Sequence, residues 1–192
     1  MRKIILASSS PRRKEIFSKT RLPFVVAPGN YEENITLKMK PKELAKFLSR
    51  GKAESVAGKH KDAVVIAADT FVAYKDRLLG KPHTPEEAKE MLKMLSDTVH
   101  SVITGYTVID TKTGKSLSRA TENKVHLRKI SDEEIDAYIK TGEPLDKAGA
   151  YAIQERGAVF VKRIEGDFLN IMGLPLYELM EDLKKFGVPG FM

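Results

Sequence analysis

A run of serines followed by a proline and two arginines is the first segment of the chain suited to bind an anion. Residues 8–10 follow a short apolar stretch, and serine before Pro11 is typical of a helix start. A helix N-terminus presents free backbone N–H groups and a partial positive charge. Arg12 and Arg13 are unfavourable there unless an anion offsets their charge. The segment therefore favours a polyphosphate site, and the alternative is an ordinary capped helix with exposed arginines.

Carboxylates form the second group of residues able to do chemistry. Asp69 follows a continuous apolar run, residues 63–68, typical of a central strand buried on both faces. If the strand stops there, the carboxylate lies where α/β sheets bind ligands, and it is placed to hold a hard cation or to accept a proton from water. A loop-capping aspartate is an equally good interpretation. Glu33 is able to complete a metal pair, although its neighbour Glu32 offers the same chemistry.

Two lysines stand in segments that allow close backbone approach. Lys81 lies in the rigid turn G-K-P, and Lys147 precedes the small residues of D-K-A-G-A-Y. Either lysine is equally compatible with a solvated surface. The histidines show no metal-binding spacing, and the chain has neither a P-loop nor a G-x-S-x-G motif. The residues thus favour phosphoryl or nucleotidyl chemistry without specifying a substrate.

Strands and helices alternate along the chain and must position these residues. Strands are expected at about residues 3–7, 24–26, 63–68, 101–109, 121–130 and 158–164. Helices are expected at about residues 11–17, 41–57, 85–95, 132–139 and 175–186. The alternation predicts an α/β fold, and a turn at residues 110–114 makes the central sheet mixed rather than purely parallel.

Length and composition restrict the class of protein. The 192 residues suit one domain, residues 1–192, with two lobes around a cleft. The net charge of +7 fits a polyanionic ligand or a lysine-rich surface, and basic and aromatic residues do not interleave as they do in nucleic-acid-binding faces. The absence of cysteine excludes disulfides and thiolate-bound zinc. Without a signal peptide or a long apolar run, we expect a cytoplasmic protein with no membrane partner.

The order of several short motifs identifies a resemblance. The chain contains, in sequence, L-A-S-S-S-P-R-R, A-A-D-T-F-V, G-K-P, M-L-x-x-L-S, H-S-V-I-T-G, D-K-A-G-A-Y-A-I-Q and G-L-P-L. Together they resemble the Maf family of nucleotide pyrophosphatases from about residue 3 to residue 187. The resemblance implies a mixed central sheet flanked by helices in two lobes around a cleft, similar to the inosine triphosphate pyrophosphatase fold. It also implies a divalent metal, Mg²⁺ or Mn²⁺, and a homodimer. We expect no stable nucleic-acid partner, because basic and aromatic residues do not interleave.

The resemblance also implies roles for individual residues. The residues that match substrate-binding positions are Ser8, Ser10, Arg12, Arg13, Lys52, Thr70, Lys81, Lys147 and Gln154. Asp69 matches the catalytic proton acceptor, and Glu33 and Asp69 match the metal ligands. Arg12, Thr70 and Gln154 resemble the branch that hydrolyses dTTP and UTP to the monophosphate and pyrophosphate, with CTP and modified pyrimidine nucleotides as further candidates.

Two departures from the family pattern leave questions open. The usual G-I-Q-G reads A-I-Q-E here, so that Ala152 and Glu155 replace glycines and a negative charge stands beside Gln154. The loop before Glu33 also departs, which leaves the choice between Glu32 and Glu33 open. A non-catalytic nucleotide- or nucleic-acid-binding regulator of cell division is the alternative function. The acidic residues retained among the basic ones favour the enzyme.

Overall fold

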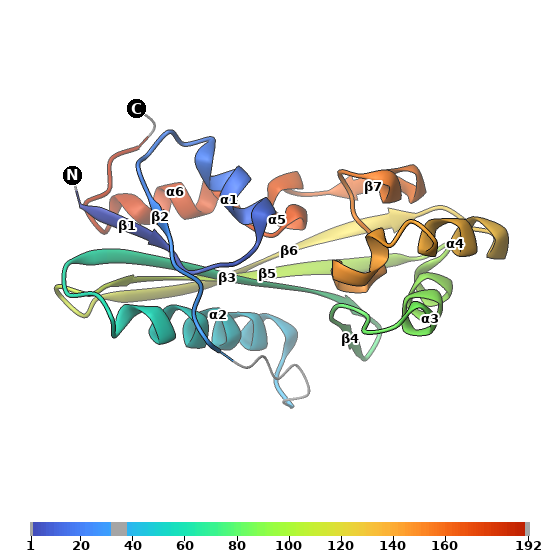
Figure 1. The fold of residues 1–192 in the computed structure, drawn as a ribbon, viewed down its shortest axis with the longest axis horizontal. Coiled ribbons are helices and arrows are strands. Elements are labelled where there is room, and N and C mark those ends of the chain that lie inside the picture. Colours follow the sequence, from blue (N-terminus) through green and yellow to red (C-terminus); the bar gives the residue numbers. More distant parts are fainter. Residues whose placement is uncertain (1, 32–37, 191–192) are drawn as a thin grey trace. The chain divides into compact units, whose positions relative to one another are not determined.

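The computed structural model of the protein describes residues 2–31 and 38–190, arranged around a mixed β-sheet (Figure 1). The seven-stranded sheet has the order β2-β1-β3-β5-β6-β7, and β4 pairs with β3. The elements are β1 (Lys3–Leu6), α1 (Pro11–Ser18), β2 (Val25–Val26), α2 (Pro41–Ala57), β3 (Ala63–Tyr74), β4 (Arg77–Leu79), α3 (Pro85–Leu95), β5 (Val99–Asp110), β6 (Ser116–Leu127), α4 (Asp132–Ile139), η1 (Glu143–Asp146), η2 (Ala148–Ala150), η3 (Arg156–Phe160), β7 (Val161–Glu165), α5 (Phe168–Met172) and α6 (Leu176–Lys184). The expected α/β fold with a mixed sheet flanked by helices is confirmed.

The chain divides into two compact units. Unit 1 contains residues 1–69, 104–121 and 173–192, and unit 2 contains residues 70–103 and 122–172. Strands β3, β5 and β6 each begin in one unit and end in the other. Each unit has a hydrophobic cluster of its own. No helix among the described residues combines the length and the apolar character needed to cross a lipid bilayer.

The parallel part of the sheet belongs to unit 1. β1 pairs in parallel with β2 and with β3, and Leu6 lies opposite Ile66. Parallel neighbours require crossover connections, which α1 and α2 provide. Within this unit α2 covers one face of the strands, and α1 and α6 cover the opposite face (Figure 1). The cluster beneath α2 consists of Ile5, Ala7, Ala53, Val56, Ala63, Val65 and Ala67.

Strand β3 is longer than the sequence indicates. The expectation that it stops at Asp69 was wrong, because the strand continues to Tyr74. β4 pairs antiparallel with this extension, and Val72 lies opposite Leu79. That pairing satisfies backbone groups that would otherwise need a loop or water. Asp69 therefore lies inside a strand, although beyond the last residue of its parallel neighbour β1.

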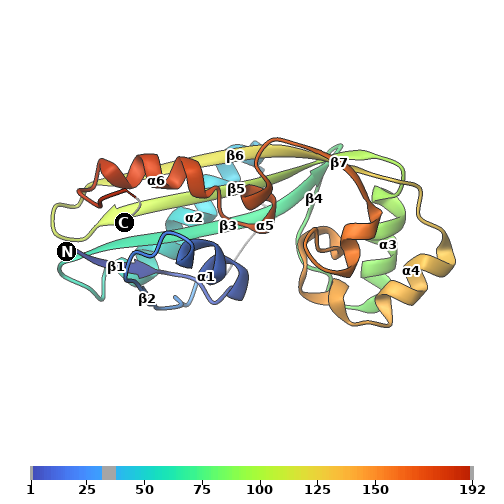
Figure 2. The same ribbon diagram turned by 90° about the horizontal axis from the view of Figure 1, so that it is seen from above.

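Unit 2 packs helices and short 3₁₀ turns around its own core. Helices α3 and α4 lie side by side (Figure 2). η1, η2 and η3 follow α4 and lead into β7, which pairs antiparallel with β6. The expected strand start at Ala158 was wrong: the chain forms η3 up to Phe160, whose buried ring packs edge-on against Tyr138 at a centroid distance of 5.1 Å.

The predicted helix starts are confirmed at three positions. Ser10 caps α1 and Thr84 caps α3, each accepting a hydrogen bond from a backbone N–H in the first turn. Ser131 and Glu134 form a capping box at the start of α4. The local sequence therefore determines where these helices begin.

Candidate active site

The serine–arginine loop connects β1 to α1 in unit 1. Ser8 is buried, and its Oγ accepts a hydrogen bond from the N–H of Ser10 at 3.2 Å. Ser10 in turn accepts from the N–H of Arg13 at 3.4 Å. Both hydroxyls thus shape the turn that opens the helix. No acidic residue stands in the first turn of α1, where Arg12 and Arg13 add their charges to the positive end of the helix.

Arg13 is held in place from another part of unit 1. Its Nε donates a hydrogen bond to the carbonyl oxygen of Gly173 at 2.9 Å. Gly173 precedes α6, so the guanidinium group is fixed between the first and last thirds of the sequence. A guanidinium group is planar and carries five N–H donors, a geometry that suits a phosphate.

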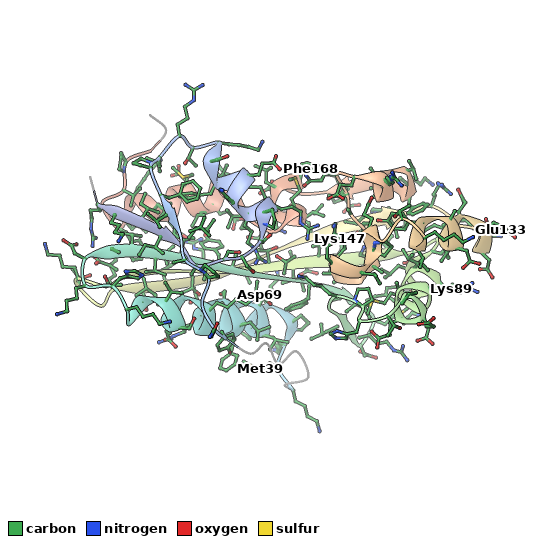
Figure 3. All side chains as sticks on the ribbon, viewed as in Figure 1. Met39, Asp69, Lys89, Glu133, Lys147 and Phe168 are labelled. Atoms are coloured by element: carbon green, nitrogen blue, oxygen red, sulfur yellow. The ribbon has the colours of Figure 1, made fainter. Side chains whose placement is uncertain are left out.

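Lys52 and Asp69 form an ion pair in unit 1. The Nζ of Lys52 on α2 donates a hydrogen bond to Oδ1 of Asp69 on β3, which Figure 3 labels. Asp69 is only 3% exposed, and the Lys52 side chain is also largely buried. A buried carboxylate is costly without a partner, and the lysine supplies the compensating charge. The structure thus brings together two of the residues expected from the sequence to do chemistry.

The register of the sheet places the Lys52–Asp69 pair near the start of the serine–arginine loop. Leu6 of β1 lies opposite Ile66 of β3, and the two strands run parallel. Ser8 and Asp69 both follow these paired residues, so Asp69 lies beside the end of β1 from which the loop starts. The carboxyl edge of parallel strands is where α/β proteins bind their ligands.

The chemistry of the donors fits a divalent cation. Mg²⁺ is commonly bound by one or two carboxylates together with substrate phosphates, and Asp69 supplies one carboxylate. Among residues 2–31 and 38–190, no three His, Cys, Asp or Glu side chains are grouped to hold a metal ion. Glu33 and Glu32 lie outside the described residues.

The remaining predicted residues belong to unit 2. Thr70 is half-buried on β3, Lys81 is exposed after β4, and Gln154 is exposed between η2 and η3. The Lys147 side chain is 7% exposed and forms ion pairs with Asp146 and with Glu155. The second pair joins Nζ to Oε1 at 3.7 Å. Figure 3 labels Lys147 in the segment between η1 and η2.

A buried histidine supports the segment that carries Lys147. Nε2 of His100 lies 2.7 Å from the hydroxyl of Tyr151, and both residues are buried. Burial, with smaller contributions from the positive charges of His126 and Lys124, lowers the pKa of His100 to about 4. Burial raises the pKa of Tyr151 well above its ordinary value. The pair is therefore neutral near pH 7 and serves packing rather than proton transfer.

Comparison with known proteins identifies the family. The model of Maf-like proteins matches residues 3–186. The chain belongs to the Maf family. A dTTP/UTP pyrophosphatase of Methanosarcina barkeri is 50% identical over 100% of this chain and 98% of its own length. A dTTP/UTP pyrophosphatase of Bacillus cereus is 43% identical over 98% of this chain and 97% of its own length.

Among solved structures, the Ham1 protein of Staphylococcus aureus aligns with a TM-score of 0.45 and 14% identity. The alignment covers 65% of this Maf chain and 71% of the Ham1 chain.

Some contacts of this Maf chain have no signal in its sequence. Lys52 pairs with Asp69 and Glu155 pairs with Lys147, and neither pair consists of sequence neighbours. The sequence singles out Lys52 only through the family resemblance, and it leaves the partner of Glu155 undetermined. Such pairs depend on how α2 packs on β3 and how η2 leads into η3.

Proposed function

We propose that this chain hydrolyses dTTP and UTP to the nucleoside monophosphate and pyrophosphate. The observation that carries the proposal is the buried Lys52–Asp69 pair beside the end of β1, where the serine–arginine loop begins. Full-length similarity to Maf relatives named dTTP/UTP pyrophosphatase supports the same activity.

The triphosphate is bound by the positive end of α1. The hydroxyls of Ser8 and Ser10, the amides of the first turn and the guanidinium groups of Arg12 and Arg13 offer donors to the phosphate oxygens. The hydrogen bond to Gly173 already restricts the Arg13 side chain, so phosphate binding costs little additional side-chain entropy at this residue.

Asp69 accepts the proton of the attacking water. The water oxygen forms a bond to the α-phosphorus, and the bond from that phosphorus to the bridging oxygen breaks. The electron pair leaves with pyrophosphate. Lys52, positioned beside Asp69, stabilises the charge that develops on the phosphoryl oxygens.

We further propose that Asp69, with Glu33, holds Mg²⁺ or Mn²⁺ together with the substrate phosphates. When bound, the cation neutralises phosphate charge and assists activation of the water. Loss of turnover in excess chelator and its return with added Mg²⁺ is the expected result.

For residues of unit 2, we propose the roles that the resemblance to the family implies. Lys81 and Lys147 contribute positive charge to phosphate binding. Thr70 and Gln154 recognise the base, because a hydroxyl and an amide can pair with the carbonyl and imide groups of a pyrimidine. A cytoplasmic location and a homodimer stay predictions, as does the absence of nucleic-acid and membrane partners.

Asp69→Asn tests the catalytic assignment. We expect kcat for dTTP and UTP to fall by about a hundredfold to ten-thousandfold, because asparagine cannot accept the proton. Pyrophosphate release from dTTP, UTP, CTP, GTP, 7-methyl-GTP and ITP is measured for the wild type, this variant and the control Asp76→Asn in the exposed turn before β4.

The outcomes separate the proposals. Wild-type kcat in Asp69→Asn would show that Asp69 is not the proton acceptor. A preference for purine nucleotides would keep the reaction and refute the base assignment. No turnover of any nucleotide, together with binding that weakens steeply with salt, would favour the regulatory alternative.

A further inference from the structure

Glu143 connects helix α4 to the start of η3 in unit 2 by hydrogen bonds. It is the first residue of η1, and its carboxylate accepts hydrogen bonds from three donors. The donors are the hydroxyl of Tyr138 at 2.7 Å, the N–H of Gly157 at 3.0 Å and the N–H of Arg156 at 3.1 Å. Two of the donors are backbone amides at the start of η3. The carboxylate therefore fixes the main chain of the later segment rather than a side chain.

Tyr138 extends the same network to the other side of that segment. Its hydroxyl accepts a hydrogen bond from the N–H of Ala152 at 3.2 Å while donating to Glu143. Burial and the bond to Glu143 raise the pKa of Tyr138 well above its ordinary value, so the phenol keeps its proton. Tyr138 thus acts as donor and acceptor at once. Its hydroxyl links the carboxylate of Glu143 to the backbone N–H of Ala152.

The main chain approaches Tyr138 so closely that a side chain at Gly157 is excluded. A Cβ at this position would lie 2.6 Å from the Tyr138 hydroxyl oxygen and 2.7 Å from the carbonyl oxygen of Ala152. Glycine is therefore required for Glu143 and Tyr138 to hold both ends of the turn at once.

Gln154 lies between the tethered amides. Ala152 on one side and Arg156 and Gly157 on the other are held by the network, and the Gln154 side chain between them is exposed. We propose that Glu143 is a positioning residue that sets the place of Gln154 and through it the preference for pyrimidine bases. This inference rests on the proposed function, in which Gln154 contacts the base.

Glu143→Gln disturbs the network with little change in volume. The amide nitrogen places a donor where the carboxylate accepted from a backbone N–H, so at least one of the three bonds is lost. We expect KM for dTTP to rise about tenfold, with kcat within about twofold of the wild type. We expect kcat/KM for GTP to change by less than about twofold, because GTP gains little from Gln154.

A double-mutant cycle separates positioning from a general structural effect. Glu143→Gln, Gln154→Ala and the combined variant are compared for dTTP and GTP. If Glu143 acts through Gln154, its substitution adds little once Gln154 is alanine. Glu133→Gln, in the exposed first turn of α4, is the matched control (Figure 3). Tyr138→Phe, which removes the acceptor for Ala152, is expected to behave like Glu143→Gln and serves if that variant does not fold.

Each outcome decides the inference. Non-additive losses confined to dTTP support it. Additive losses, or equal losses for dTTP and GTP, overturn it while the proposed function stands. A wild-type protein that releases no pyrophosphate from dTTP overturns the proposed function and the inference with it.

Discussion

The Lys52–Asp69 pair places opposite charges in a part of unit 1 that solvent hardly reaches. Removing Lys52 leaves the charge of Asp69 buried and uncompensated, which is far more costly than the loss of an exposed ion pair. The same pair therefore matters for stability as well as for the proposed chemistry.

Lys52→Met isolates the stability contribution. We expect the free energy of unfolding to fall by about 3 kcal/mol, because methionine keeps much of the side-chain volume and leaves Asp69 without its cation. Urea unfolding measures the difference. Arg50→Met, on the same helix and removing only the exposed pair with Glu54, is expected to change the free energy of unfolding by less than about 0.5 kcal/mol. Equal effects of the two substitutions would contradict this role of Lys52.

Glu155 illustrates how structure changes the interpretation of a single residue. From the sequence, its negative charge lies beside the residue proposed to recognise the base. In the structure the charge faces Lys147, whose ammonium group it shares with Asp146. The departure from the family pattern is thus partly balanced within unit 2.

At the level of elements, α2 approaches β5 at a glycine. A Cβ at Gly105 would lie 2.1 Å from the carbonyl oxygen of Ala45, a backbone atom that cannot move without the helix. The close approach also brings Ser49 of α2 into hydrogen-bonding distance of Thr107, at 2.9 Å. Helix and strand are therefore fixed together close to where α2 carries Lys52.

Gly105→Ala tests this contact. We expect the free energy of unfolding to fall by about 3 kcal/mol, because the added methyl group forces α2 away from the strand. Gly58→Ala, at the end of the same helix, is the control: a Cβ there meets nothing within 4 Å. The control is expected to leave stability unchanged or to raise it slightly. Thermal and urea unfolding compare the two, and an unaffected Gly105→Ala would refute the tight contact.

For the whole molecule, the pH dependence of stability follows from groups whose pKa values differ between the folded and unfolded chain. The pKa of His100 falls from 6.5 to about 4 on folding, so the unfolded chain binds its proton first as the pH is lowered. Stability is therefore lost as the pH falls through this window. Asp110, whose pKa is held well below its ordinary value by hydrogen bonds from Arg2, contributes a loss only at lower pH.

His100→Gln separates the contribution of His100 to the pH dependence of stability from the contributions of the other titratable groups. We expect the wild type to lose about 3 kcal/mol of stability between pH 6.5 and pH 4 through His100, and the variant to lack this part of the slope. Urea unfolding at several pH values measures the difference between the two proteins. His60→Gln, at a partly exposed site after α2, is the control and should keep the wild-type slope. Parallel pH profiles of the wild type and His100→Gln would contradict the assignment.

Local sequence determined the helices well. Caps such as Ser10 and Ser131 satisfy the first amides of a helix within a few residues, so their effect does not depend on the rest of the fold. The strand ends were predicted less well, because a strand ends where its partners end. β3 continues past Asp69 since β4 pairs with it, and η3 replaces the first part of an expected strand.

The sequence by itself determined the alternation of elements, the mixed sheet, the serine–arginine loop and, through the order of its motifs, the family. Only the tertiary structure decided which residues contact one another. Lys52 forms an ion pair with Asp69, Glu155 forms one with Lys147, and the first backbone N–H groups of η3 donate hydrogen bonds to Glu143. The physical reason is range. Caps and periodicity act between residues within a turn or two of each other, whereas an ion pair or a carboxylate network joins residues from different elements that packing must bring together.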